Sequence, residues 1–218
     1  MSGSYCCAVA VAALILSIAS ILVTVVAVYF GKRSADAATT ATNIERERRH
    51  AEMRPRYLVT CDAPNPGTDQ RRLYVKLAGP GELGALDQLT VTIRDDSHFR
   101  LKPAPAPGQP PESVPDQVWG PLRFVPGTGP GTLTRPAAFR ADAAGRATTS
   151  AGLPVGEEHI YALEMTYPPP GWGTRQLWVA RVGSTLRLRV ESRKEGWDPW
   201  IAVGEINVAD ARTVAEIT

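Results

Sequence analysis

The sequence predicts a mainly β protein, in which an N-terminal transmembrane helix and a helical stalk precede an antiparallel β-sandwich or barrel-like domain. Three observations predict this fold class. An uncharged apolar run lies near the N-terminus, the next stretch holds no Gly or Pro up to residue 55, and short alternating runs separated by Gly- and Pro-rich turns follow. We expect a transmembrane anchor over 1–31, a basic juxtamembrane stalk over 32–55 and a β domain over 56–218.

The expected anchor is the run from Tyr5 to Phe30, which holds 26 residues without a charge or a proline. About 20 apolar residues are enough to cross the hydrocarbon core of a bilayer. Tyr5, Tyr29 and Phe30 lie at the ends of the run, where interfacial aromatic residues are enriched. A cleaved signal peptide is the alternative, but its basic N-terminal region, shorter apolar run and small-residue cleavage site are missing.

Charge is distributed unevenly along the chain. Residues 1–31 carry none, residues 32–56 carry seven basic and four acidic side chains, and residues 57–218 carry seventeen basic and eighteen acidic ones. Basic flanks tend to remain cytoplasmic, so we expect a single-pass protein of the cell membrane with its C-terminal domain in the cytoplasm. Export of the domain behind an uncleaved anchor is the alternative. The near-neutral domain argues against a nucleic-acid partner, which requires many Lys and Arg side chains.

Small residues recur along the anchor at alternating spacings of four and three. The seam comprises Ala13, Ser17, Ser20, Thr24, Ala27 and Gly31, is preceded by Cys6 and Ala10, and continues into the stalk as Ser34, Ala38 and Ala41. Helices in lipid associate through close backbone approach and interhelical hydrogen bonds. The pattern therefore predicts a parallel homodimer or small oligomer, formed through this face of the anchor helix.

The stalk and the β domain differ in their residue patterns. Good helix formers predict a helix from about Ala35 to Arg54, ended by Pro55 because a proline disfavours the helical conformation of the residue before it. Beyond Pro55, period-two alternation predicts strands. The expected inward side chains include Val91, Ile93, Leu186, Leu188 and Val190, and the candidate strands are YLVTCD, RRLYVKLA, LTVTIR, WGPLRFV, IYALEMTY, QLWVARV, TLRLRVES and WIAVGEI. The segments 102–115 and 126–152 read as long loops.

No motif in the sequence predicts catalysis, a metal site or a cofactor. His50, His98 and His159 have no Cys or His neighbour at the spacing of metal ligands. The run from Asp95 to His98 contains triad residue types but no nucleophile elbow, and the glycine-rich run 127–132 lacks the lysine of a phosphate-binding loop. We therefore expect a non-enzymatic protein.

Tryptophan and arginine gather in the last third of the chain. The candidate ligand- or partner-binding residues are Trp172, Arg175, Trp178, Arg187, Arg189, Trp197 and Trp200. Aromatic side chains interleaved with arginine can bind glycans, nucleic-acid strands or peptides. The competing interpretation is that the tryptophans pack the core while the arginines line the solvent face of strands.

Two motifs suggest a family. The run WGPLRF at 119–124 and the run RKEGWDPW at 193–200, behind a charged juxtamembrane helix, resemble a group of uncharacterised actinobacterial single-pass membrane proteins with a C-terminal β domain. The resemblance covers roughly residues 45–203. It implies a membrane-tethered β domain, and the group has no assigned activity or catalytic residues to carry over.

These observations lead to two binding hypotheses, beside a third, an enzyme, which a deep cleft with converging carboxylates would favour and for which the sequence offers no such residues. The first is a membrane-tethered interaction module that binds an unidentified protein or peptide partner. The second is an extracytoplasmic module that binds a glycan or peptide through the Trp/Arg-rich third of the chain. The side of the membrane on which the domain lies discriminates between them.

Overall fold

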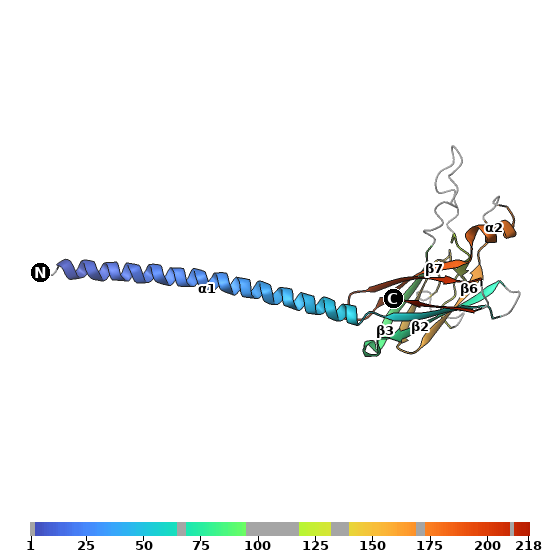
Figure 1. Cartoon of the computed structure of the whole chain (residues 1–218), viewed down its shortest axis with the longest axis horizontal. Coiled ribbons are helices and arrows are strands. Elements are labelled where there is room, and N and C mark those ends of the chain that lie inside the picture. The colour runs from blue at the N-terminus through green and yellow to red at the C-terminus, as the bar shows by residue number, and fades with distance from the viewer. Residues whose placement is uncertain (1–2, 65–68, 95–117, 132–139, 169–172, 210–211) are drawn as a thin grey trace, which may run out of the picture. The chain divides into compact units, whose positions relative to one another are not determined.

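The computed structural model describes residues 3–64, 69–94, 118–131, 140–168, 173–209 and 212–218, without the side chains of 3–23, 25 and 26. The predicted loop 102–115 and the run from Asp95 to His98 lie outside these residues. The chain divides into two compact units, Met1–Ala51 and Glu52–Thr218. Each unit is described by itself (Figure 1).

The first unit is a single helix, α1, which runs without interruption over Gly3–Glu52 (Figure 1). It stops just before Pro55, so the expected stalk helix is present and continuous with the residues of the expected anchor. Side chains from Ala27 to Arg49 are all exposed. Within the described part of the chain, no helix combines the length and the apolar character that a membrane crossing requires. The span over residues 1–31 therefore stays a prediction.

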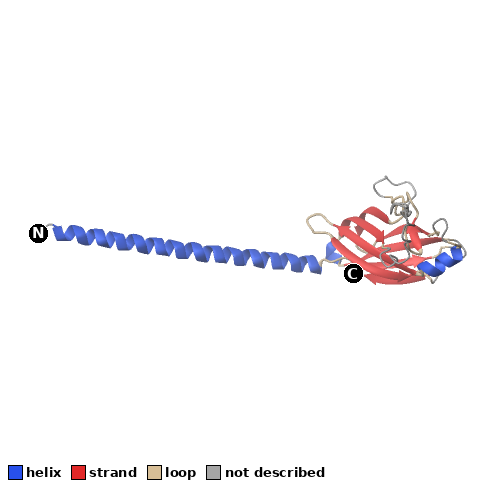
Figure 2. Cartoon of the chain, turned by 90° about the horizontal axis from the view of Figure 1, so that it is seen from above, coloured by secondary structure: helices blue, strands red, loops and turns tan. Residues whose placement is uncertain are grey.

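The second unit consists of two antiparallel sheets, which confirms the mainly β fold class (Figure 2). One sheet has the strand order β4-β6-β2-β1-β9 and the other β5-β3-β7-β8. The elements are β1 (Arg56–Asp62), β2 (Gln70–Gly79), the short 3-10 helix η1 (Gly81–Leu83), β3 (Ala85–Ile93), β4 (Leu122–Phe124), β5 (Ala147–Pro154), β6 (Glu158–Met165), α2 (Arg175–Val182), β7 (Thr185–Arg193), β8 (Trp200–Asn207) and β9 (Arg212–Ile217).

The core lies between the sheets and is built by the predicted alternation. Val91 and Ile93 of β3 pair with Val190 and Leu188 of β7, and all four side chains are at most 1% exposed, as is Leu186. Arg187 and Arg189 alternate with them and face outward. The sequence prediction for these residues is confirmed. Successive side chains of a strand point to opposite faces of the sheet, so every second one faces the core.

The prediction of a strand at QLWVARV is wrong, since these residues belong to α2. Thr174 caps the helix by accepting a hydrogen bond from the Leu177 amide, and Gly183 follows the last turn. Trp178 and Val182 are the buried side chains of α2 and lie four residues apart, which is one face of a helix. A helix of two turns is too short for its apolar pattern to distinguish a helical repeat of 3.6 residues from the two-residue repeat of a strand.

The predicted loop over 126–152 is wrong at its end, because β5 begins at Ala147, and β9 lies outside the predicted strands. The inward side chains of β5 include Thr148 and Ser150, which are 2% and 0% exposed. Buried hydroxyl groups leave no apolar alternation for sequence analysis to detect.

The two ends of the sandwich can be distinguished by strand β1. At the end where β1 begins, Arg56 pairs with Gly79 of β2, and the Arg54 side chain donates to the carbonyl of Ile201 at the start of β8. We call this the entry end. The far end holds the end of β1, the start of β2, the start of β7 and the end of β8. Seven residues of strand separate the two ends by about 23 Å.

Candidate functional site

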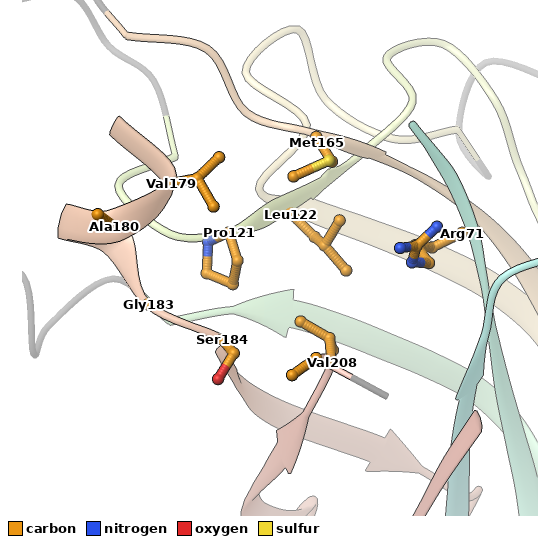
Figure 3. Close-up of a pocket in the computed structure, with 10 residues that line it drawn as sticks. Arg71, Pro121, Leu122, Met165, Val179, Ala180, Gly183, Ser184 and Val208 are labelled. Carbon is orange, nitrogen blue, oxygen red and sulfur yellow. The ribbon is translucent and has the colours of Figure 1, made fainter. Parts of the chain in front are cut away.

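A pocket of about 400 Å³ opens at the far end of the sandwich (Figure 3). Segments from both sheets and from α2 converge on it. It is lined by Arg71, Pro121, Leu122, Met165, Val179, Ala180, Gly183, Ser184, Val208 and Ala209. We call this the far-end pocket. Most of its lining is apolar, with one guanidinium and one hydroxyl, which is the composition typical of a binding site.

Helix α2 forms one wall of the far-end pocket and is held in place by tryptophan packing. The Trp178 ring lies 5.7 Å from the Trp119 ring, measured between centroids, and both side chains are buried. Trp178 Nε1 donates to Thr166 Oγ1 over 2.9 Å, and Thr166 Oγ1 donates in turn to the Gly120 carbonyl. Every polar group in this chain of hydrogen bonds has a partner, so burying it carries little cost.

A polar cluster lies beside the pocket at the start of α2. Arg175 Nη2 donates to Asp69 Oδ1, and Tyr167 Oη donates to Asp69 Oδ2 over 3.0 Å. The Arg175 guanidinium lies 5.3 Å from the centre of the Tyr167 ring and 3.5 Å from the sulfur of Met165, which lines the pocket. The hydrogen bond from Arg175 lowers the pKa of Asp69, and the same bond raises the pKa of Arg175. The cluster therefore keeps its charges at neutral pH.

Apolar side chains remain exposed around the pocket. Tyr167 is 52% exposed, Leu177 is 65% exposed and Val179 is 39% exposed. The last two lie on α2, and Val179 also lines the pocket. Large apolar side chains that flank a pocket extend the area that a partner could cover.

The structure does not bring the predicted Trp/Arg residues together. Arg175 and Trp178 belong to α2 at the far end, whereas Trp197 and Trp200 lie at the entry end with their ring centroids 5.6 Å apart. Between these ends, on the outer face of β7, Arg187 forms an ion pair with Glu205 over 2.9 Å and Arg189 with Glu191 over 3.2 Å. Trp172 lies outside the described residues.

The described tryptophans do not form an exposed aromatic surface. Trp119, Trp178 and Trp200 are 1%, 2% and 4% exposed, and Trp197 is half-buried against the core. A glycan-binding surface of stacked aromatic rings needs open ring faces. In the part of the chain that the structure describes, the tryptophans pack instead, while Arg187 and Arg189 line the outer face of a strand.

The residues of the predicted self-association seam lie along α1. Thr24, Ala27 and Gly31 are exposed, whereas the side chains of Ala13, Ser17 and Ser20 are outside the description. The structure contains one copy of the chain and leaves the predicted association as a prediction.

A hydrogen-bonded Ser/His pair occurs inside the domain, which the sequence analysis missed. Ser150 Oγ lies 2.9 Å from His159 Nδ1 and 3.1 Å from Tyr161 Oη, and it joins β5 of one sheet to β6 of the other. Ser150 is 0% exposed, so no substrate could reach its hydroxyl oxygen. We interpret the group as a polar contact between the sheets. Among the residues that the structure describes, no cluster of His, Cys, Asp or Glu could hold a metal ion.

The chain was compared with family models, with curated proteins and with solved structures, and none of them matches it. The far-end pocket therefore has to be interpreted from its own chemistry. No local sequence pattern predicts this pocket, because its lining comes from five separate segments whose convergence depends on the topology of the two sheets.

Proposed function

We propose that the chain is a membrane-tethered, non-enzymatic interaction module that binds a protein or peptide partner in the far-end pocket. The observation that carries the proposal is the apolar lining of this pocket together with the exposed side chains of Tyr167, Leu177 and Val179 beside it. A pocket of about 400 Å³ is large enough for one or two side chains of a peptide.

The tether is proposed from the uncharged run between Tyr5 and Phe30. Helix α1 continues beyond it from residue 31 to residue 52, which corresponds to a rise of about 30 Å. An unbroken helix of this length would act as a spacer between the bilayer and the domain. The far-end pocket lies at the end of the sandwich opposite Arg56, the first residue of β1.

The proposed orientation places the domain in the cytoplasm, following the basic residues after the anchor. Protease added to intact cells should leave the β domain uncut, and permeabilised cells provide the control in which it is cut. Digestion from outside the intact cell would contradict this orientation and favour the extracytoplasmic module.

Self-association through the anchor is proposed from the seam of small residues. In a chain lacking native cysteines, single cysteines at Ser17, Ser20 or Thr24 should form intermolecular disulfides more readily than cysteines at Ile18, Leu22 or Val25. The control positions lie off the seam on the same helix, so equal trapping at both sets of positions would show that the seam is not an interface.

Peptide binding is tested by selection from a phage-displayed library of random dodecapeptides on the full chain in lipid nanodiscs. We expect particular peptide sequences to be enriched on the unmodified chain. The enrichment should persist with Ala78→Trp, a control that adds a ring at an exposed position on β2. It should disappear with Ala180→Trp, which fills the mouth of the pocket. Empty nanodiscs serve as the blank. Absence of enrichment, or equal enrichment on the Ala180→Trp chain, would contradict the proposal.

A further inference from the structure

The outer face of the β4-β6-β2-β1-β9 sheet carries a mostly apolar row that crosses four strands. Its members lie directly opposite one another on β6, β2, β1 and β9, and they are Ile160, Tyr74, Thr60 and Val214. The two ends of the row are open to solvent, since Ile160 is 37% exposed and Val214 is 53% exposed. We call these four residues the apolar row. The outer face of the other sheet is polar at its centre, where Thr90 and Thr149 share a hydrogen bond.

Charged side chains border the apolar row on both sides. Two residues further toward the entry end, the same four strands carry Glu158, Lys76, Leu58 and Glu216. Two residues further toward the far end, they carry Ala162, Arg72, Asp62 and Arg212. The first set holds two acidic residues and one basic residue, and we call it the acidic row. The second holds two basic residues and one acidic residue, and we call it the basic row.

We infer that a second copy of this chain stacks on this face, with the two apolar rows in contact and a two-fold axis running along them. Rotation about this axis reverses the strand direction, so the acidic row of each copy lies over the basic row of the other. An axis parallel to the strands would instead place acidic row on acidic row. Charge complementarity suppresses wrong arrangements and fixes the register of an interface. The face is separate from the far-end pocket, so the inference does not depend on the proposed function.

The contact is defined most sharply on β9. Rotation about the apolar row brings Val214 of the two copies together at the axis. On either side of this contact, Glu216 of one copy meets Arg212 of the other, and both side chains are exposed on the same face of β9 as Val214. The interface is self-complementary, because each of these contacts occurs twice.

Strand β2 provides the one like-charge contact of the arrangement, where Lys76 of one copy lies over Arg72 of the other. Each of these cations lies directly opposite an acidic residue of its own sheet, Glu158 for Lys76 and Asp62 for Arg72. Opposite charges on neighbouring strands are favourable, so these carboxylates offset the repulsion between the two cations.

Edge-to-edge pairing of two β9 strands would also bring Arg212 opposite Glu216. It would leave Ile160 in water, because Ile160 lies three strand spacings from Val214, or about 14 Å. Face-to-face stacking covers the whole apolar row, as in the packing of two sheets in a sandwich. The inference therefore commits to stacked faces, and edge pairing becomes an outcome of the test.

Disulfide trapping of the full chain in detergent micelles, in a background without native cysteines, tests the stacked faces. Val214→Cys and Ile160→Cys each place a thiol at the axis, and Val203→Cys is the matched control, a 50% exposed valine on the outer face of the other sheet. Both axis positions should form intermolecular disulfides at least about five-fold faster than the control, because the contact raises the effective concentration of the thiols. Trapping at Val214 alone would show edge pairing, and equal trapping at all three positions would show random collision. Either result would overturn the inference.

Charge reversal on the Val214→Cys background then tests the register. Arg212→Glu or Glu216→Arg places like charges together at both symmetric contacts, so each should slow trapping about ten-fold. Mixing the two variants should restore trapping as a mixed disulfide, because a chain with two acidic residues on β9 then faces a chain with two basic ones. Restoration also shows that both variants fold. Unchanged trapping in the single variants, or a loss that mixing does not restore, would overturn the inference.

Discussion

The two ends of the sandwich each hold a pair of packed tryptophans, and the far end also holds the far-end pocket. At the entry end Trp197 and Trp200 lie 5.6 Å apart, and at the far end Trp119 and Trp178 lie 5.7 Å apart. At the entry end, Lys194 Nζ donates to the backbone carbonyls of Leu83 and Ala85. At the far end, the cation Arg175 bonds to an exposed side chain instead.

The difference shows that a pair of packed tryptophans can lie against the main core at one end and hold an added helix in place at the other. Trp200 belongs to the main hydrophobic core, whereas Trp178 belongs to a separate cluster with Trp119 and Val182. The entry end is therefore part of the folding unit that joins both sheets. The far end adds α2 to a sandwich that already has its core, and a locally attached element is where binding surfaces are commonly found.

The largest expected effect separates the two tryptophans. Trp200→Ala should lower the free energy of unfolding by about 3–5 kcal/mol, because it leaves a cavity in the main core. Trp178→Ala should lower it by less, because it removes packing from the separate cluster only, and it should abolish peptide binding by releasing the pocket wall. Urea unfolding of the full chain, followed by tryptophan fluorescence, reports on the β domain, since no tryptophan precedes Trp119. Equal losses of stability would contradict the distinction between the ends.

The next effect concerns two glycines in the connection from β4, a wall of the pocket, to β5. Gly145 has φ +71°, and a Cβ atom there would lie 2.2 Å from the carbonyl oxygen of Phe124. Gly145→Ala should therefore cost about 3 kcal/mol, from the left-handed backbone and the clash together. Gly127 has φ +75° but open space around it, so Gly127→Ala should cost about 1 kcal/mol. Similar midpoints in urea for the two variants would show that the contact with Phe124 relaxes freely.

The sequence predicted the core of the sandwich better than its far end, and the reason is physical. Strands such as β3 and β7 place aliphatic residues on one face and polar residues on the other, so local pattern alone identifies them. Helix α2 depends on a cap at Thr174 and on packing against Trp119, which is remote in the sequence. The pocket depends on the convergence of residues such as Arg71, Leu122 and Val208, which no local pattern encodes.

The third prediction uses pH to compare the two ends of strand β1. Burial raises the pKa of Cys61, near the far end, from 9.0 to about 11, and raises the pKa of Tyr57, near the entry end, from 10.0 to about 12. In the unfolded chain each group ionises at its ordinary pKa, whereas in the folded domain it stays neutral up to the raised pKa. As the pH rises, the unfolded chain therefore loses these protons before the folded domain does. Stability should be complete below pH 9, fall between pH 9 and 11 through Cys61, and fall between pH 10 and 12 through Tyr57.

Each group should contribute a loss on the order of 2 kcal/mol across its window. Urea midpoints of the full chain at pH 8 to 12 measure the loss. Cys61→Ala should remove the earlier part of the decline and Tyr57→Phe the later part, so each variant is compared with its own value at pH 8. A decline that is unchanged in both variants would assign the alkaline sensitivity to other groups.

The smallest effect compares the cations at the two ends. Lys194→Gln removes a charge whose ammonium donates to the carbonyls of Leu83 over 2.6 Å and Ala85 over 3.1 Å, at the turn that leads into β3. Because hydrogen bonds to charged groups contribute more than neutral ones, and because Lys194 is half-buried, the free energy of unfolding should fall by about 1.5 kcal/mol. Arg175→Gln removes a cation of equal charge from an exposed pair with Asp69, where water screens the attraction, so the urea midpoint should stay nearly unchanged. If Arg175→Gln lowered the urea midpoint more than Lys194→Gln, the polar cluster beside the pocket would contribute more to the stability of the domain than the lysine at the entry end.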